Sequence, residues 1–495
     1  MDAVREGWAC SRSSVCTPTL SVGCRTCRAP RRTRSTVFDL AIGLAVVVLI
    51  TPLVFSSVSR RVGYAAIALT GVLLAATLLP RSFLTIVPAP EGVPNDISTA
   101  SLTMMTGPLA YLIALVIILT NRGQFRLPFS LVVFALALTA GMFLLWEGTV
   151  PQWSGYFVLL SAVAAWGVGW AVGREVFTNV RLARYLMIVC LVIVVIQLTI
   201  VVLQLSNVQL PEWLAGSDRT LEQTTGRASG TVGHPANLSK ITFMLTILAL
   251  PFTTSADRRT RRLAFLVTIA CVVVGGFTIS RANLVATFIL LSLWILTYPG
   301  RARVGTRALG GIALAGATAA FAPMVLERFE DDAAGGLRPQ LFEAGMRQLN
   351  ANLWTGTGPN AYIAVVGQVD SATATGLPIH NTPLLLIAEL GLPIAMCFML
   401  PVAGLVWWAL RTFPSARRHL YVPRAVTYAL PGLGIIFWTG WGMASSLLIG
   451  LVMFVFGLLS SARIGISDSM LLPDAALQAN PAPLGTDRLA RTTPT

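Results

Sequence analysis

Residues 182–205 read LARYLMIVCLVIVVIQLTIVVLQL, an almost unbroken apolar run. An α-helix rises about 1.5 Å per residue, so roughly 20 such residues cross the ~30 Å hydrocarbon core of a bilayer. Apolar runs of roughly this length recur along almost the whole chain. Because only helices and closed barrels span membranes, the repetition predicts one polytopic helical bundle.

The composition is typical of an integral membrane protein. Of the 495 residues, 55% are hydrophobic and 12% are charged, and the mean hydropathy is +0.73. In a soluble protein the formal net charge of +15 would suggest nucleic acid as a partner, but most of these arginines lie in short connections between apolar runs. We therefore interpret the charge as a topology signal, and expect membrane lipids but no nucleic acid as partners.

The predicted fold class is all-α: a polytopic transmembrane bundle of about 12 to 13 helices, with a long extracytoplasmic loop that contains short helices. The candidate membrane segments are 37–58, 62–80, 101–120, 127–146, 154–172, 182–205, 236–254, 263–279, 283–299, 306–326, 383–410, 424–442 and 446–462.

Arginines gather in alternate connections, which fixes the expected topology. The basic connections are those at 174–184, 258–262, 301–307 and 411–424. By the positive-inside rule they face the cytoplasm, so the connections at 206–235, 280–282 and 327–382 face outside. The same counting places the basic N-terminal tail outside, against the rule. Either the first two apolar runs form a non-standard hairpin or one of them does not span.

Composition divides the chain into four parts. Residues 1–36 are rich in Ser, Arg, Thr and Cys without periodicity and are predicted to be a disordered tail. Residues 37–205 form N-terminal transmembrane helices, starting with a retained anchor that lacks a clear signal-peptide cleavage site. Residues 206–463 hold the remaining helices and the outer loop 327–382, and residues 464–495 form a disordered cytoplasmic tail.

No metal or cofactor is predicted. The seven cysteines include one Cys24-x-x-Cys27 pair, which resembles half of a zinc site but has neither a second pair nor a nearby histidine. The outer acidic run Glu330-Asp331-Asp332 is interpreted as a solvated stretch rather than a cation site.

The segment Leu337–Leu392 is polar in an otherwise apolar chain, and it combines an amphipathic helix, the glycine-rich turn GTGPN at 356–360 and a histidine at the predicted interface. A helical projection at about 100° per residue puts Leu341, Phe342, Gly345 and Leu349 within roughly 60° of Arg338, on an apolar face expected to dock, and Arg347 on the opposite side. Arg338 therefore needs an anionic partner or a path to water, whereas Arg347 is expected to be solvated. A structural salt bridge of Arg338 to Glu343 or Glu389 is the alternative.

Two further outer connections carry an arginine. Residues 226–237 read GRASGTVGHPAN, whose glycines and proline predict a tight turn that can direct backbone N–H groups and Arg227 at one anion, ahead of the helix with Lys240. Alternatively, Arg227 reaches lipid headgroups and His234 caps the next helix. Residues 278–283 read TISRAN, which places Arg281 between two apolar runs with almost no loop; it is a functional candidate or a surface anchor.

His380 precedes the apolar run that begins near Pro383, so its imidazole is expected at the outer interface. A histidine there has a pKa near neutrality and can accept a proton from a sugar hydroxyl. The alternative is a helix cap or an interfacial residue. The third histidine, His419, lies in a basic connection and is assigned no chemistry.

Taken together, these motifs resemble the O-antigen ligase and polymerase superfamily. The matching strings are RASGTVGHPAN at 227–237, SRAN at 280–283, LRPQLFEAGMRQL at 337–349, GTGPN at 356–360 and HNTPLLLIAELGL at 380–392. The resemblance covers about 182–442 and rests on the order of these strings and their common outside placement. The chain departs from the family where SRG reads Ser280-Arg281-Ala282, and in one helix beyond the common twelve.

The resemblance implies a bacterial inner-membrane enzyme whose active site faces outside and which transfers or polymerises a glycan from a polyprenyl diphosphate carrier. His380 is implied as the base, with Asn381 or Glu389 orienting it. Arg227, Arg281 and Arg338 are implied as ligands of the donor diphosphate, supported by His234 and Lys240. Implied partners are the lipid-linked glycan donor, a glycan, lipid or protein acceptor, a flippase and a chain-length regulator.

Two other classes stay open. A transporter or lipid flippase would also be a basic polytopic bundle, but such proteins place paired charges near the bilayer midplane. A non-catalytic polysaccharide assembly subunit would not need His380. Ligase and polymerase differ only in the acceptor.

Overall fold

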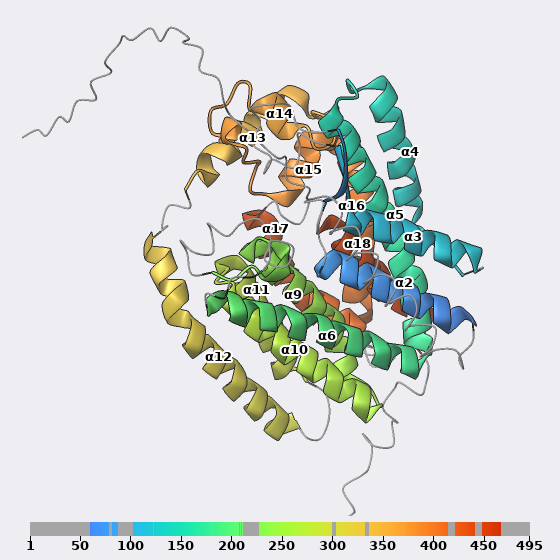
Figure 1. Ribbon diagram of the computed structural model, residues 1–495, viewed down its shortest axis with the longest axis vertical. Helices are drawn as coiled ribbons and strands as arrows, with labels where there is room; N and C mark the ends of the chain where they lie inside the picture. The colour runs from blue at the N-terminus through green and yellow to red at the C-terminus, as the bar shows by residue number, and fades with distance from the viewer. Residues whose placement is uncertain are drawn as a thin grey trace, which may run out of the picture.

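The computed structural model describes residues 60–78, 82–87, 102–121, 123–206, 208, 210, 227–298, 303–331, 336–413, 421–440 and 448–466. The described part is a helical bundle, which confirms the predicted class (Figure 1). The predicted run 37–58, the N-terminal tail and its four cysteines, His419, Asp332 and all but the first three residues of the tail 464–495 lie outside it.

The helices follow the predicted apolar runs closely. They are α2 Arg60–Thr77, α3 Thr106–Thr120, α4 Phe129–Leu144, α5 Val150–Thr178, α6 Val180–Leu205, α9 Pro235–Ala249, α10 Arg258–Phe277, α11 Arg281–Leu296, α12 Arg303–Asp331, α13 Arg338–Asn352, α14 Tyr362–Val366, α15 Thr382–Leu390, α16 Leu392–Thr412, α17 Val422–Thr439 and α18 Ile449–Ser460. Short 3₁₀ turns are η1 Gly230–Val232, η2 Leu250–Thr254, η3 Thr373–Thr375 and η6 Ser461–Ile464.

Five of the described helices are long and apolar enough to cross a membrane. They cover Val150–Thr178, Val180–Leu205, Pro235–Thr254, Arg258–Phe277 and Leu392–Thr412. Shorter apolar helices cover Val62–Thr77, Thr106–Thr120, Phe129–Leu144, Arg281–Leu296 and Ile449–Ile464. The protein is therefore a multi-pass membrane protein.

Two predicted segments are wrong in detail. The run 383–410 is not one helix, because Gly391 adopts φ 73° and ψ 156° and separates α15 from α16. The run 101–120 begins as a strand: β2 Leu102–Met105 pairs antiparallel with β1 Ser82–Val87, in the register Ser82↔Met105 to Val87↔Leu102. Alternating and β-branched residues in SFLTIV favour this hairpin, a small addition to the all-α class.

Helices α5 and α18 pack closely through glycines at the centre of the bundle. A methyl group on Gly169 would lie 2.1 Å from Phe454 O, and one on Gly457 would lie 2.2 Å from Trp166 O. Such small residues let two membrane helices approach backbone to backbone. Because α5 and α18 come from the two predicted transmembrane parts of the chain, both parts share this core.

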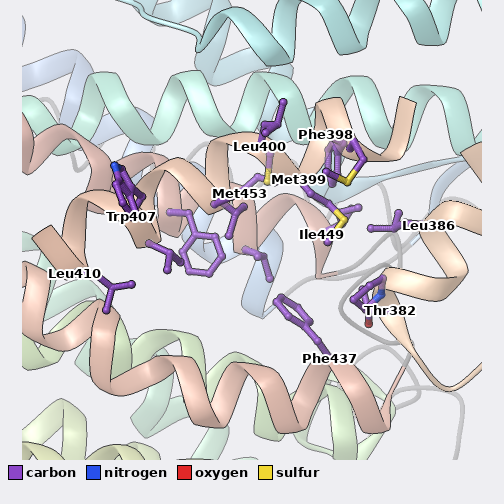
Figure 2. Close-up of a pocket in the computed structure, with 17 residues that line it drawn as sticks. Thr382, Leu386, Phe398, Met399, Leu400, Trp407, Leu410, Phe437, Ile449 and Met453 are labelled. Carbon is purple, nitrogen blue, oxygen red and sulfur yellow. The ribbon is translucent and has the colours of Figure 1, made fainter. Parts of the chain in front are cut away.

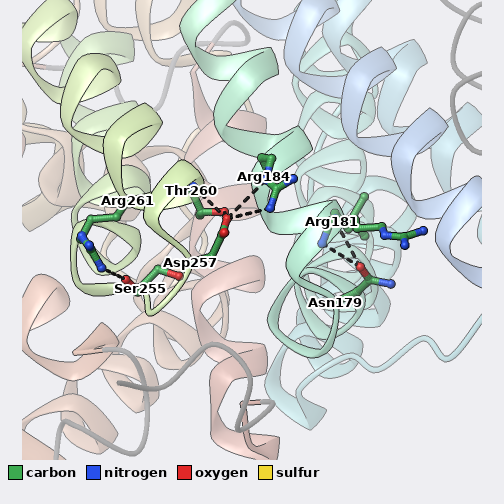
Figure 3. Close-up of polar contacts among 8 residues, drawn as sticks. Asn179, Arg181, Arg184, Ser255, Asp257, Thr260 and Arg261 are labelled. Carbon is green, nitrogen blue, oxygen red and sulfur yellow. Dashed lines mark hydrogen bonds and ion pairs between the residues drawn. The ribbon is translucent and has the colours of Figure 1, made fainter. Parts of the chain in front are cut away.

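The described parts of the basic connections converge at one end of the bundle, which we call the arginine-rich end: residues 174–184, 254–262, 297–298, 303–307 and 421–424. There Arg184 of α6 pairs with Asp257 at the start of α10 at 3.1 Å (Figure 3). Tyr298 donates to Thr253 O at 2.7 Å, and Arg424 donates to Thr297 O at 3.4 Å. The basic connections, which alternate with less basic ones along the sequence, thus lie together at one end of the bundle.

The outer loop forms a small core of its own at the opposite end. Helices α13, α14 and α15 lie together in Figure 1. A buried cluster joins them, made of Ala344, Leu349, Tyr362, Val366, Ile379, Leu385 and Ala388. Helix α12 extends to Asp331, five residues beyond its predicted end, before the loop begins.

Candidate functional site

The connections with predicted site residues converge opposite the arginine-rich end, in a region we call the site end: residues 146–155, 227–237, 277–283, 336–382 and 440. The side chain of Arg227, which is 9% exposed, donates from Nε to Thr278 O at 3.0 Å. Ala228 N donates to Phe277 O at 3.3 Å. These bonds place the segment with Arg227 directly against the turn that leads to Arg281.

The glycine-rich turn after Arg227 does not direct its first amides at an anion. Gly230, with φ 60°, donates its N–H to Gln204 Oε1 at 2.9 Å. Thr231 donates its N–H to Gln197 Oε1 at 3.0 Å. A methyl group on Gly230 would lie 2.2 Å from the same Gln197 oxygen, so the glycine is needed for close packing on α6. The two glutamines were not recognised in the sequence because they lie inside an apolar run.

His234 caps α9, as the alternative interpretation had it. Its Nδ1 accepts the N–H of Ala236 at 3.2 Å, so the ring proton of the neutral form sits on Nε2. Desolvation by the surrounding protein, followed by the charges of Arg227 and Lys240, lowers the pKa of His234 below its ordinary value. His234 is therefore a neutral imidazole that presents an N–H donor.

The turn before Arg281 holds a strained residue. Ile279 adopts φ 50°, which is unfavourable for a β-branched side chain. Asn283 fixes the turn, because its Nδ2 donates to Ser280 Oγ and to Ser239 Oγ of α9, both at 2.7 Å. Arg281 is consequently the first residue of α11 and half-buried. Strain of this kind concentrates at functional sites.

Helix α13 has the predicted buried face. Leu341 is 0% and Leu349 is 8% exposed, and a methyl group on Gly345 would lie 2.5 Å from Ile379 Cδ1. Two residues assigned to this face are not docked: Phe342 is 40% exposed, and Arg338 is exposed in the first turn of the helix, so the projection was wrong for them. Arg347 is exposed on the other side, and it also pairs with Asp370 at 2.7 Å, a contact that the projection did not predict.

The turn GTGPN at 356–360 docks the outer loop on the bundle. Gly358 N donates to Glu389 O at 2.8 Å, and Gln152 of α5 donates to Thr357 O at 3.0 Å. Gly356 has φ 63°, and a methyl group there would lie 2.4 Å from Glu389 O. The glycines allow backbone packing rather than substrate contact.

His380 directly precedes α15 and is half-buried. Its Nδ1 lies 3.0 Å from Pro378 O, and because a carbonyl only accepts, Nδ1 carries the proton and Nε2 has a free lone pair. Burial and the charge of Arg338 lower the pKa of His380, the bond to Pro378 O partly offsets them, and the charge of Lys240 lowers it further. The Pro378 carbonyl is the orienting group that sequence reasoning missed.

Asn381 and Glu389, the residues expected to orient His380, make other contacts. Asn381 Oδ1 accepts the N–H of Leu384 at 3.0 Å and so caps α15. The Glu389 carboxylate accepts the backbone N–H groups of Asn360 and Tyr362, and burial raises its pKa to about 7. Glu389 thus fixes the start of α14 against α15.

Lys240 lies on α9 and is 6% exposed. Its Nζ is 3.6 Å from the position that a Cβ on Gly440 would take. Gly440 O in turn accepts the hydroxyl of Thr382 at 2.6 Å. The site end therefore brings Lys240 into the same neighbourhood as His234 and His380, together with Arg227 and Arg338. In the described part of the chain, no group of three or more His, Cys, Asp or Glu residues could hold a metal ion.

Part of the chain matches a known protein family. The model of this family, described as O-antigen ligase, matches residues 263–399, which run from α10 through Arg281, Arg338 and His380 into α16. No curated protein matches the chain. The family match confirms the resemblance drawn from the motifs.

Proposed function

We propose, from the match to the O-antigen ligase family over residues 263–399, that this membrane protein is a glycosyltransferase. It transfers or polymerises a glycan from a polyprenyl diphosphate carrier onto an acceptor hydroxyl at the extracytoplasmic face of the bacterial inner membrane. Its place is the biosynthesis of a cell-surface polysaccharide. Arg227, Arg281 and Arg338 bind the donor, and His380 is the base.

The observation that carries the proposal is the free Nε2 of His380 next to fixed cations. The bond from Nδ1 to Pro378 O sets the tautomer, and Arg338 and Lys240 lie close enough to act on the ring by charge. An acceptor hydroxyl gives its proton to Nε2 as its oxygen bonds to sugar C1. The C1–O bond to the diphosphate breaks, and its electron pair leaves with the polyprenyl diphosphate.

Cationic side chains at the site end suit this leaving group. Negative charge grows on the diphosphate oxygen as the bond breaks, and preorganised donors stabilise it without rearrangement. Arg227 and Arg281 are held by the contact between the 227–237 segment and the 278–280 turn. Because side chains can neutralise the diphosphate, we expect transfer to continue in the presence of a metal chelator.

An apolar groove supports a lipid carrier. The groove has a volume of about 470 Å³ and starts at Thr382, two residues after His380 (Figure 2). It continues along α16 past Met399 and Trp407 to Leu410, with Phe437 and Met453 on its other sides. This stretch of α16 corresponds to roughly 20 Å, a large part of the hydrocarbon core. A linear hydrocarbon tail fits there while its anionic head stays at the site end.

The test uses the purified full-length protein in lipid nanodiscs, with a polyprenyl diphosphate-linked glycan and one acceptor at a time: a lipid-anchored glycan, a protein or a second glycan chain. We expect release of polyprenyl diphosphate with one of them, which also separates ligase from polymerase. Donor binding without release would contradict the enzyme assignment. Movement of intact donor across liposomes would favour a flippase instead.

A further inference from the structure

Two glutamines of α6 hold one peptide group of the turn that follows Arg227. Gln204 Nε2 donates to the carbonyl of Gly230 at 3.0 Å, and the N–H of Thr231 donates to Gln197 Oε1 at 3.0 Å. The Gly230 carbonyl and the Thr231 N–H belong to the same peptide unit, so side chains of α6 bind both of its hydrogen-bonding groups. The plane of this peptide is therefore fixed relative to the helix.

The same two amides make further bonds. Gln204 Oε1 also accepts the N–H of Gly230 at 2.9 Å. Gln197 Nε2 donates to Thr231 Oγ1 at 2.8 Å and to Thr77 O at 2.7 Å. Because Thr77 is the last residue of α2, Gln197 joins α2, α6 and the turn. Each amide thus uses both its oxygen and its nitrogen, and it cannot rotate without losing a bond.

The beginning of this segment is bound to the turn that leads into α11. Arg227 Nε donates to Thr278 O at 3.0 Å, and Ala228 N donates to Phe277 O at 3.3 Å. All five residues of the segment 227–231 are buried. The segment is thus bound inside the protein at both of its ends, to α11's entry turn and to α6. Its position depends on these hydrogen bonds rather than on contacts with water or lipid.

The two glutamines are unusual in a helix as apolar as α6. Gln197 is 1% exposed, and burying an amide without hydrogen bonds is unfavourable. The two residues are seven positions apart. They therefore lie on the same side of the helix, about 10 Å apart along its axis. Apolar side chains would be sufficient for packing here, so the amides are explained by the peptide group that they bind from two sides.

We propose that Gln197 and Gln204 are positioning residues for donor binding: they hold the 227–231 segment so that Arg227 meets the donor diphosphate. This inference rests on the proposed function of Arg227. The glutamines act through Arg227 and do not touch the donor. A misplacement of about 1 Å can reduce the activity of a site by up to about 100-fold. Release of the bound peptide group is expected to move Arg227 away from the diphosphate.

A double-mutant cycle tests this coupling. The measured quantity is the Kd of a short-chain polyprenyl diphosphate for the full-length protein in lipid nanodiscs. Gln204→Leu removes the bonds to Gly230 and is expected to raise the Kd about tenfold, but less than about twofold when Arg227 is already Ala. In the Arg338→Ala protein, whose change lies on α13, Gln204→Leu should still raise the Kd about tenfold. An equal factor in all three backgrounds overturns the proposal.

Controls separate positioning from packing. Thr199→Val is the matched control on α6, because this exposed hydroxyl bonds only Val195 O of its own helix, at 3.0 Å, and its loss should leave the Kd unchanged. Thermal unfolding shows whether each variant is folded. If Gln204→Leu does not fold, Thr231→Val replaces it; it removes one hydroxyl, keeps the shape and should raise the Kd about threefold. That rise should disappear in the Arg227→Ala background, and an equal rise there overturns the proposal.

The outcomes also separate this inference from the proposed function. A wild-type protein that does not bind polyprenyl diphosphate contradicts the proposed function, and the inference falls with it. Weaker binding by Arg227→Ala together with unchanged binding by folded Gln204→Leu and Gln197→Leu proteins keeps the function and overturns the inference.

Discussion

The cations at the two ends of the bundle have different neighbours. At the arginine-rich end, Arg184 pairs with Asp257, Arg261 donates to Ser255 O at 2.7 Å, and Arg424 lies 4.9 Å from the ring of Tyr421. At the site end, Lys240 acts by charge on both His234 and His380, and Arg338 acts on His380. The difference teaches that a cation balanced by the protein stabilises the fold, whereas cations gathered around neutral imidazoles fit an anion from outside.

Replacing His380 by Ala should have the largest effect on transfer. General bases contribute about 10²- to 10⁴-fold, so release of polyprenyl diphosphate is expected to slow by that factor while donor binding stays. His419→Ala, in the basic connection 411–424 of the sequence, is the matched control and should transfer normally. A fully active His380→Ala protein would favour the non-catalytic assembly subunit.

Replacing Gly356 by Ala should destabilise the site end, because the backbone leaves no room for a methyl group there. The residue has φ 63°, and the new methyl group would lie 2.4 Å from Glu389 O, so we expect a loss of about 2–4 kcal/mol in stability together with slower transfer. Thermal unfolding of the purified protein measures the loss of stability. Gly404→Ala is the control, since its methyl group would meet no atom within 4 Å. Equal melting of the two variants would show that the turn does not dock the loop.

Arg338 and Arg347 both lie on α13 but have different neighbours, so replacing each of them tests the comparison of cations within one helix. Arg338→Ala removes a cation next to His380 and should reduce kcat/KM for the donor by about 10- to 100-fold, the range of a charged hydrogen bond. Arg347→Ala breaks only the exposed pair with Asp370, which is worth about 0–1 kcal/mol. Steady-state kinetics with a varied donor concentration compare them. Equal losses of kcat/KM in the two variants would mean that the position of an arginine around α13 does not affect use of the donor.

Local patterns predicted much of this arrangement, whereas contacts between distant segments were not predictable. The projection of 338–349 correctly grouped Leu341, Gly345 and Leu349 because it needs only helical periodicity, but it also placed on this face Phe342, which is exposed. It could not show the pair between Arg347 and Asp370, which meet because the chain between them turns back through α14. The division of the chain at 206 stays a prediction.

The site was predicted less completely than the fold for the same reason. Charge and motif pointed to His380 and the arginines, whose roles stay predictions. The neighbours that set their chemistry are backbone groups such as Pro378 O, or residues about 200 positions away such as Gly440 beside Lys240. A glycine inside an apolar run gives no local sign of whether it breaks a helix, so the break at Gly391 was missed.

The pH profile of transfer should show the state of His380. Burial, Arg338 and Lys240 lower its pKa in the free enzyme, so the base stays neutral to a lower pH than an ordinary histidine, and kcat/KM falls only as the pH drops through that lowered value. With saturating donor, kcat should fall at a higher pH, because the diphosphate offsets the positive charge near the ring. An acid limb of kcat/KM at or above the pH of an ordinary histidine would contradict the lowered pKa of His380.

Asp257 tests the arginine-rich end, where the smallest effect is expected and only on stability. Partial burial disfavours its charge, but hydrogen bonds from Thr260 and Arg184 outweigh burial and lower its pKa. Asp257→Ala removes the cap of α10 and the ion pair, so it should cost about 1–2 kcal/mol at pH 7 and leave kcat unchanged. A carboxylate with a lowered pKa stabilises the fold above its unfolded pKa and loses this contribution as the pH falls through the folded value. The difference in melting temperature between wild type and variant should therefore shrink in acid, and Asp257→Asn, which keeps the cap, should lose less. Slower transfer by Asp257→Ala at unchanged stability would show that the arginine-rich end contributes to transfer and not only to stability.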